Sequence, residues 1–421
     1  MLGVETIARI HRAYFVQGKT IKTICRRAAG VAEGRAEGHP DTSKNRLLRG
    51  PWRGSMALAR GRSAWQASWV FVDVDERLAA LSRAGDPLER LASVVDFEVF
   101  RDELERALLR SDRAKGGRPP YDAVLMFRLL VLQTLYTLSD EQAEYQVRDR
   151  RSFLRFVGLG LGDPVPDAKT LWLFREQLTR AGATEALFAR FDRLLRDAGY
   201  LAMGGQIVDA TVVEARRPRL KAEEKTIVKG GGAPESWSKA KTAQIDRDGR
   251  WTLKRGRKRP PKADERVATE LVVPCFGYKN HVTIDRRHGF VRRYTVTHAA
   301  AHDGAQLAAV LDPDNTASGV WADTAYRSKE NLAMLARRGL VERLQRPKPR
   351  GKPMAPDIRR GNAKRAKVRA AVEHVFAAQK RRLGLVIRTV GKARAETKLG
   401  LANLVTNMLR LAWFETRPAP A

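Results

Sequence analysis

The chain has 421 residues, of which 43% are hydrophobic and 30% charged, so it is long enough for two or three folded domains and too apolar for a disordered protein. Lys and Arg outnumber Asp and Glu by 79 to 47, and the formal charge of +32 favours a nucleic acid partner over a merely Arg-rich composition. Two cysteines exclude a disulfide framework, and the longest apolar run, Val124 to Tyr136, is too short to cross a bilayer, which predicts a cytoplasmic protein without membrane contact.

The first half of the chain divides into three regions. Residues 1–27 predict a pair of helices, because apolar side chains recur at helical spacing on both sides of Gly18. Residues 28–62 are rich in Gly, Arg and Ser without periodicity, which predicts a disordered linker. Helical periodicity returns over 63–198 and predicts an all-α domain.

Two helix starts in this all-α domain carry capping signals. Ser139 and Gln142 have the spacing of a capping box, and Asp167 precedes a short basic helix over 168–178. As the second helix of a helix-turn-helix, the basic helix would direct its side chains towards DNA, whereas an ordinary surface helix has the same composition. The side chains concerned are Lys169, Thr170 and Arg175.

After Gly199 the periodicity changes to that of strands and predicts a mixed α/β domain over 199–415. The predicted strands are 207–213, 277–285, 290–297 and 319–323, with a helix at 302–311. Between the first two strands, 216–266 is rich in Gly and Lys and predicts a flexible basic insertion, either a solvated loop or an arm that contacts phosphates.

Asp209 lies in the middle of an apolar strand. Strand alternation puts it on one face with Ile207 and Thr211, and puts Glu214 on the other face. A carboxylate in such a place is tolerated when it faces a metal ion or a cationic partner, which favours a site over a simple hydrogen-bond acceptor at a strand end.

Two further carboxylates are candidates on weaker grounds. Asp323 ends a short strand, where α/β sheets place their sites and where an Asp also commonly caps a turn. Glu373 lies on a helix over 366–382 with Arg369 and Lys380 in the same narrow sector. An i,i+4 salt bridge on a solvated face is the alternative for Glu373.

Five segments, taken in order, resemble those of bacterial transposases of the insertion sequence 5 family. They are Val208-Asp-Ala-Thr-Val-Val-Glu214, Phe276-Gly-Tyr-Lys-Asn-His281, His302-Asp303, Ala322-Asp-Thr-Ala-Tyr326 and Arg369-Ala-Ala-Val-Glu-His374. The resemblance implies a catalytic domain with an RNase H-like mixed sheet and flanking helices, preceded by an all-α DNA-binding domain. It also implies an Asp-Asp-Glu (DDE) triad formed by Asp209, Asp323 and Glu373.

In that family the triad holds two Mg²⁺ ions, for which Mn²⁺ can substitute, and these ions support cleavage at the element's ends and 3′-OH strand transfer. The implied partners are double-stranded DNA of the terminal inverted repeats and of the target, in the bacterial nucleoid. Because two ends must be held, a homodimer on DNA is expected. Ala366 occupies the Tyr position of the related Tyr-Arg-Glu-Lys signature. The side chains expected to hold phosphates near the metals are Arg369, Lys380, Lys279 and His281.

A second resemblance concerns the N-terminus. The run from Arg12 to Lys22 looks like the opening helix-turn-helix of insertion sequence 21 type transposases, and it stops before the DNA-reading helix is complete. We therefore expect residues 1–27 to be a remnant of a fused or misread gene start, with the transposase beginning near Met56.

Two other function classes stay open from the sequence. One is a regulator that binds DNA and has lost catalysis, and the other is a structure-directed nuclease with the same fold. A tyrosine recombinase is disfavoured, because no Tyr follows Tyr326 and such an enzyme needs a C-terminal Tyr nucleophile.

Overall fold

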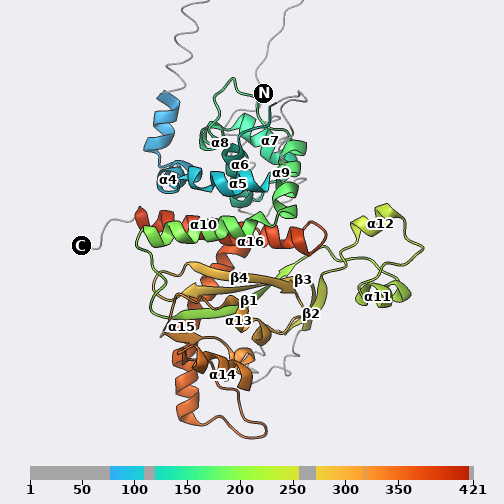
Figure 1. Ribbon diagram of the computed structural model, residues 1–421, viewed down its shortest axis with the longest axis vertical. Coiled ribbons are helices and arrows are strands. Elements are labelled where there is room, and N and C mark those ends of the chain that lie inside the picture. The colour runs from blue at the N-terminus through green and yellow to red at the C-terminus, as the bar shows by residue number, and fades with distance from the viewer. Residues whose placement is uncertain (1–75, 109–118, 256–271, 317, 417–421) are drawn as a thin grey trace, which may run out of the picture. The chain divides into compact units, whose positions relative to one another are not determined.

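The computed structural model describes residues 76–108, 119–255, 272–316 and 318–416, shown in colour in Figure 1. These residues all belong to one compact unit that starts at Ala67. The predicted helix pair at 1–27, the linker at 28–62 and the first residues of the predicted helical domain lie outside the described residues.

The N-terminal part of the described chain is helical, as predicted. The capping box at Ser139 is present, with both of its hydrogen bonds, and Asp167 caps its helix by accepting from Thr170 N at 2.6 Å. Phenylalanines from four of these elements pack on one another in the core. The elements are α4 (Pro87–Val94), η2 (Phe97–Phe100), α5 (Arg101–Ala107), α6 (Ala123–Tyr136), α7 (Asp140–Asp149), α8 (Arg151–Val157), α9 (Ala168–Arg180) and α10 (Ala183–Asp197).

Among the described helices, none is by itself long and apolar enough to span a membrane. Only α6 and α7 taken together, across a bend of 102°, reach the necessary length and composition. Most side chains of α6 are buried in the helical core.

A mixed sheet of six strands follows in the described residues, and four of them lie close to the predicted positions. Its order is β2-β3-β1-β5-β6, with β4 paired to the second half of β3. Strand β1 lies at the centre, antiparallel to β3 and parallel to β5. The strands are β1 (Gln206–Glu214), β2 (Arg250–Arg255), β3 (Val272–Asp285), β4 (Val291–His298), β5 (Gly319–Trp321) and β6 (Val341–Glu342).

Gly277 lies where β3 changes partners from β2 to β4. Its φ is +155°, and a Cβ added there would lie 2.2 Å from the carbonyl oxygen of Val213 on β1. The clash would be with the backbone of a paired strand, which cannot move aside without breaking the ladder. A residue with a side chain therefore does not fit at this position.

We expect Gly277→Ala to lower the free energy of unfolding by at least about 2 kcal/mol, because the new methyl group overpacks the β1–β3 pair. Urea titration followed by circular dichroism measures this. Gly162→Ala is the matched control, since nothing lies within 4 Å of a Cβ at that position. Equal, small effects of the two substitutions would contradict the close approach of the strands.

The predicted flexible insertion is wrong for residues 216–255, which contain α11 (Ala222–Lys229), α12 (Lys239–Gln244) and β2. Trp237 is buried, and its Nε1 donates to Glu224 Oε1 at 2.7 Å. Lys241 Nζ donates to the same oxygen at 2.7 Å and lies 4.7 Å from the Trp237 ring centroid. Residues 256–266 of the predicted insertion lie outside the described ranges.

Helices cover both faces of the sheet. On one face lie α15 (Pro356–Arg381) and α16 (Lys392–Glu415), packed on β1 and β4. On the other face, a separate apolar cluster around Val208 and Val320 is covered by the remaining elements. These are η4 (Asp303–Gln306), α13 (Leu307–Val310), η5 (Thr324–Tyr326) and α14 (Lys329–Arg337).

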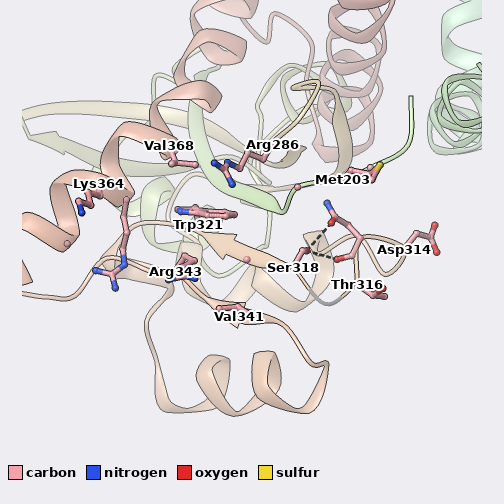
Figure 2. A pocket seen from close by; sticks show the side chains of 16 residues that line it. Met203, Arg286, Asp314, Thr316, Ser318, Trp321, Val341, Arg343, Lys364 and Val368 are labelled. Carbon is pink, nitrogen blue, oxygen red and sulfur yellow. Dashed lines mark hydrogen bonds between the residues drawn. The ribbon is translucent and has the colours of Figure 1, made fainter. Parts of the chain in front are cut away.

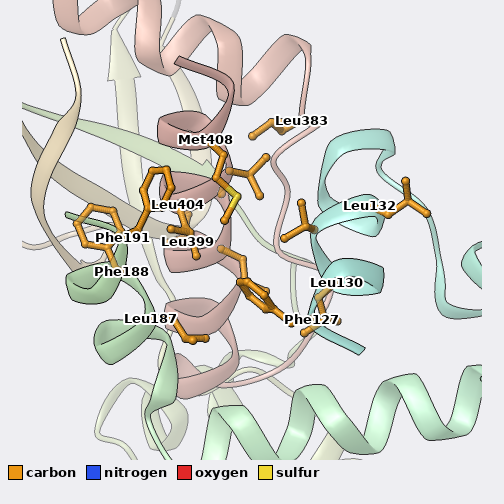
Figure 3. Packing of buried hydrophobic residues seen from close by; sticks show 14 of the residues in the cluster. Phe127, Leu130, Leu132, Leu187, Phe188, Phe191, Leu383, Leu399, Leu404 and Met408 are labelled. Carbon is orange, nitrogen blue, oxygen red and sulfur yellow. The ribbon is translucent and has the colours of Figure 1, made fainter. Parts of the chain in front are cut away.

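Helix α16 joins the helical part to the sheet. Figure 3 shows it between α10 and α6, with Leu399, Leu404 and Met408 facing the buried aromatic side chains Phe127 and Phe191. The same hydrophobic cluster continues to β3 and β4. The two predicted regions, 63–198 and 199–415, therefore share one core in the part that the structure describes.

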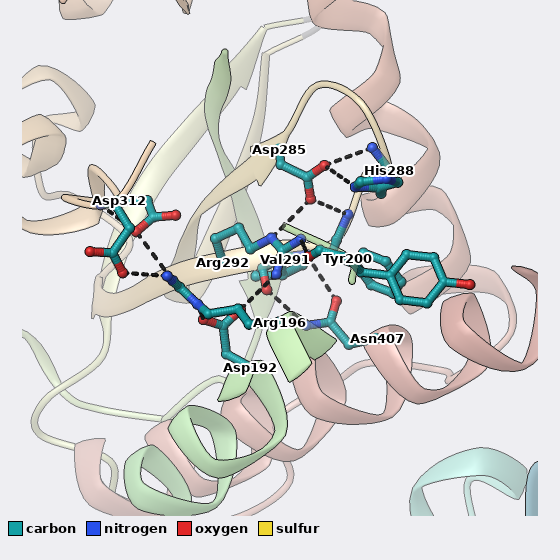
Figure 4. Close-up of polar contacts among 11 residues, drawn as sticks. Asp192, Arg196, Tyr200, Asp285, His288, Val291, Arg292, Asp312 and Asn407 are labelled. Atoms are coloured by element: carbon teal, nitrogen blue, oxygen red, sulfur yellow. Dashed lines mark hydrogen bonds and ion pairs between the residues drawn. The ribbon is translucent and has the colours of Figure 1, made fainter. Parts of the chain in front are cut away.

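Two buried polar networks fix these elements. Arg292 on β4 is fully buried and contacts Asp285 on β3 at 3.0 Å and Asp192 on α10 at 2.9 Å (Figure 4). A second network of amides links α15 to β3 through α16, with Gln379 Nε2 donating to Asn403 Oδ1 at 2.8 Å and Asn280 Nδ2 donating to the same oxygen at 2.9 Å. Buried polar groups that are satisfied in this way favour one arrangement of the helices over others.

Candidate active site

Asp209 lies on the central strand with the orientation that strand alternation predicts. It is 9% exposed and shares its face of β1 with Thr211, beneath α15. Its Oδ1 accepts from Ala210 N at 2.8 Å, and its Oδ2 accepts from Arg369 Nη1 on α15. Burial is the main cause that raises the pKa of the Asp209 carboxyl to about 6, against the opposing effect of the Arg369 charge.

Asp323 follows β5, the parallel neighbour of β1. Ile207 pairs with Trp321, so two residues further along the two chains Asp209 and Asp323 come level with each other. Asp323 also caps η5, because its Oδ1 accepts from Ala325 N at 2.8 Å. Its charge contributes to the raised pKa of Asp209. Asp323 thus has both the capping role and the position beside Asp209.

Glu373 reaches the same place from α15. Its carboxylate lies 3.6 Å from Arg369 Nη1, the nitrogen that also contacts Asp209, and its charge also raises the pKa of Asp209. Its side chain is 58% exposed, so it faces solvent above the strands. The structure therefore brings Asp209, Asp323 and Glu373 together, and the i,i+4 pair with Arg369 is part of the same cluster.

These three carboxylates suit a hard divalent cation, because Mg²⁺ prefers oxygen ligands. Among the described residues, however, no group of three His, Cys, Asp or Glu side chains is arranged to hold a metal ion. The Arg369 guanidinium lies between Asp209 and Glu373 instead and supplies positive charge. Burial and the neighbouring carboxylates raise the pKa of Asp209 more than the positive charge of Arg369 lowers it, so the cluster has room for further positive charge. The donor types and the charge of the cluster therefore fit a divalent cation.

Lys380 lies farther along the same face of α15. Its Nζ donates to Thr211 Oγ1, and burial lowers the pKa of the ammonium group. The sector that holds Arg369, Glu373 and Lys380 therefore lies over the Asp209–Thr211 face of β1. Thr211 was not a candidate from the sequence, although its i+2 spacing from Asp209 placed it on the same face.

Lys279 and His281 lie on the opposite face of the sheet, because their partners on β1 are Val212 and Ala210. Lys279 Nζ donates to Asp303 Oδ1 at 2.8 Å and to the carbonyl oxygen of Ala301 at 2.7 Å. The His281 ring lies 2.8 Å from Thr297 Oγ1, and burial lowers the pKa of His281 to about 4. Neither side chain contacts the three carboxylates.

Tyr326 and Asp303 are members of the site region that sequence reasoning passed over. Tyr326 is 1% exposed, and its hydroxyl has no hydrogen-bond partner among the described residues. Burial raises the pKa of Tyr326, and the charges of Asp209, Asp303 and Asp323 raise it further. Both residues stand in the segments His302-Asp303 and Ala322 to Tyr326, which was the available signal.

The candidate DNA-binding residues of α9 differ in their surroundings. Lys169 is exposed in the first turn, and Thr170 is half-buried beside it. Arg175 is part of a network within the helical core, since it donates two hydrogen bonds of 2.7 Å to Asp140 and one of 3.0 Å to Gln133. Arg175 therefore fixes α9 against α6 and α7.

Two protein families match the chain. Residues 76–177, which span α4 to α9, match the family described as Transposase domain (DUF772). Residues 200–408, which contain Asp209, Asp323 and Glu373, match the family described as Transposase DDE domain. No solved structure matches. Together these matches support an insertion-sequence transposase of the DDE type.

Proposed function

We propose that this transposase belongs to the insertion sequence 5 family, cleaves the phosphodiester bond at the ends of its element and transfers the freed 3′-OH into target DNA. The observation that carries the proposal is the meeting of Asp209, Asp323 and Glu373 from two parallel strands and the helix above them. An RNase H-like fold is part of the proposal, and the mixed sheet with helices on both faces supports it.

In this proposal the three carboxylates hold two Mg²⁺ ions, or Mn²⁺ in their place. When bound, the ions activate the attacking oxygen and stabilise the leaving 3′ oxygen. Asp209, being buried and central, is oriented by the amide of Ala210. Glu373, being exposed, is free to adjust its position over the strands.

The cations on α15 bind the DNA strand beside the carboxylates. Arg369 presents a planar guanidinium that can hold two phosphate oxygens, and Lys380 presents a point charge beyond Glu373. Lys279 supports the site indirectly, because its ion pair with Asp303 holds η4 against β3. We assign His281 the same supporting role, given its complete burial.

The helical part is proposed to bind the terminal inverted repeats. Lys169 and Thr170 stand in the first turn of α9, where the exposed ammonium group of Lys169 can pair with a phosphate. Because a transposase must hold two ends, we propose that it acts as a homodimer on double-stranded DNA.

The test uses DNA that carries both element ends, incubated with the full chain and Mg²⁺. We expect both cut and joined products, and we expect Asp209→Asn, Asp323→Asn and Glu373→Gln each to abolish them. Glu223→Gln is the matched control, since this exposed carboxylate lies on α11, outside the strands and the helix that carry the three carboxylates. Retained cleavage in all three variants would refute the assignment. Cut products that are never joined would indicate a nuclease, and end binding without cleavage would indicate a regulator.

A further inference from the structure

A cavity of about 830 Å³ opens beside the N-terminal half of α15, between the turn that leads into β1 and the ends of β5 and β6 (Figure 2). The side chains that line it include one aromatic ring, four cations and a single carboxylate. They are Trp321, Arg286, Arg343, Lys364, Arg365 and Asp314.

The Trp321 ring forms one wall of this cavity because two glycines make room for it. A Cβ at Gly205 would lie 2.3 Å from Trp321 Cζ3, and a Cβ at Gly319 would lie 2.7 Å from Trp321 Cη2. Gly205 also has φ +106°, which residues with a side chain rarely adopt. The backbone therefore backs one side of the indole, and on the cavity side only the exposed Arg286 lies over the ring, at 5.0 Å from its centroid.

The cavity carries uncompensated positive charge. Arg286, Arg343, Lys364 and Arg365 form no ion pair with any acidic residue in the part of the chain that the structure describes. The carboxylate of Asp314 is already engaged by Arg196 on α10. Four cations around one wall create a strong local attraction for phosphate groups.

Two elements that line the cavity also lead to the carboxylate cluster. Trp321 is the last residue of β5, and Asp323 follows it by two residues. Arg365 stands one helical turn before Arg369 on α15. A DNA strand whose phosphate lies at the carboxylates thus has its neighbouring nucleotides within reach of the indole and the four cations.

We propose that this cavity binds an unpaired nucleotide of the DNA strand adjacent to the scissile phosphate, with its base stacked on Trp321 and its phosphates held by Arg343, Lys364 and Arg365. An indole face is useful only to a base that has left the duplex stack, because paired bases hide their faces. Arg286 lies over the ring but is exposed, so its side chain can move off the indole and stack on the outer face of the entering base, since a guanidinium also stacks on bases. The inference rests on the proposed function, because it names the state of the DNA strand that reaches the carboxylates.

The experiment measures binding of the full chain to two labelled probes in EDTA by fluorescence anisotropy. One probe is a duplex with a short single-stranded extension, and the other is the same duplex with a blunt end. We expect the extended probe to bind more tightly than the blunt duplex. Trp321→Leu should lower the affinity for the extended probe by roughly tenfold and leave the affinity for the blunt duplex unchanged. Trp321→Phe should restore most of the advantage.

A second pair of variants keeps the test decisive if Trp321→Leu fails to fold. Arg343→Gln/Lys364→Gln changes two exposed cations of the cavity, and Lys329→Gln/Arg337→Gln removes the same charge from the exposed side of α14. Only the first pair should weaken binding to the extended probe and lower its salt dependence, by roughly 0.7 in slope for each lost phosphate contact. The proposal would be overturned if the two double variants bound the extended probe equally well. It would also be overturned if the cavity variant lost as much affinity for the blunt duplex as for the extended probe.

Failure of this inference is distinguishable from failure of the proposed function. The binding assay contains no metal ion and involves no cleavage. A chain that prefers the extended probe through Trp321 but never cuts DNA would leave the cavity assignment standing and refute the transposition chemistry. A chain that cuts and joins DNA but binds both probes equally would leave the transposition chemistry standing and refute the cavity assignment.

Discussion

Replacing Asp209 with Asn is expected to lower the rate of end cleavage by roughly a thousandfold, since a metal ligand contributes several kcal/mol to the reaction barrier. The same substitution is expected to leave the fold as stable as before or more stable. Asp209 is buried, and its pKa is raised from 3.8 to about 6, so its charge opposes folding at neutral pH. At 1.36 kcal/mol for each pH unit, that opposition amounts to about 3 kcal/mol at most.

The pH dependence of stability provides an independent check on Asp209. Between pH 3.8 and about 6 the folded protein binds more protons at this carboxyl than the unfolded chain does, so its contribution to stability falls as pH rises through this window. Above pH 6 the unfavourable contribution is complete. Thermal unfolding in EDTA should therefore show Asp209→Asn more stable than the wild type at pH 7.5, with the difference closing towards pH 4. A variant that is clearly less stable at pH 7.5 would contradict this account.

Replacing Arg292 with Met is expected to lower the free energy of unfolding by about 3 to 5 kcal/mol, because it leaves the buried carboxylate of Asp285 without its arginine and leaves Asp192 with Arg196 alone. Asp285 has no exposed side-chain surface and Asp192 has little, so water cannot replace the guanidinium. Arg292 also donates to the carbonyl oxygen of Tyr200, which ties the segment after α10 to β4. Chemical denaturation of the metal-free chain measures the loss.

Arg293→Met is the control for this second prediction. Arg293 follows Arg292 on β4 and is exposed, so its replacement should change stability by no more than about 0.5 kcal/mol. Similar losses for the two neighbours would mean that the buried network around Arg292 does not stabilise the fold as its contacts indicate. The comparison separates a buried ion network from the general effect of losing one positive charge on a basic chain.

Four of the six described strands and most helices were predictable because their periodicities are strong. Alternation along 207–213 placed Asp209 and Thr211 on one face, and the cap at Asp167 set the start of α9. Helix α15 begins earlier than predicted, at Pro356, because its first turns are polar and carry little apolar periodicity. Helices α11 and α12 were missed for a related reason. They are held in place by Trp237 and its polar partners, and contacts of this kind cannot be predicted from a Gly- and Lys-rich composition.

The three candidate carboxylates could be named from the sequence, but the side chains that contact them could not. Strand register decides which face of β3 meets Asp209, and the sequence does not contain that register, so the positions of Lys279 and His281 could not be derived. The partner of Arg175 is Asp140, which is distant in sequence and is brought near only by helix packing. The position of Arg369 between two carboxylates depends likewise on how α15 crosses β1.

Helix α16 fixes the distance between the proposed repeat-binding helices and the three carboxylates. It packs against α6, α9 and α10 on one side and against β4 on the other, within one continuous core. The helices proposed to bind the inverted repeat and the carboxylates proposed to cut DNA are therefore held in fixed positions relative to each other. Under the proposed function, this rigid core sets the number of base pairs between the bound repeat and the cleavage point. An extra base pair between the bound repeat and the cleavage point would move the cut along the DNA rather than be absorbed by a flexible linker.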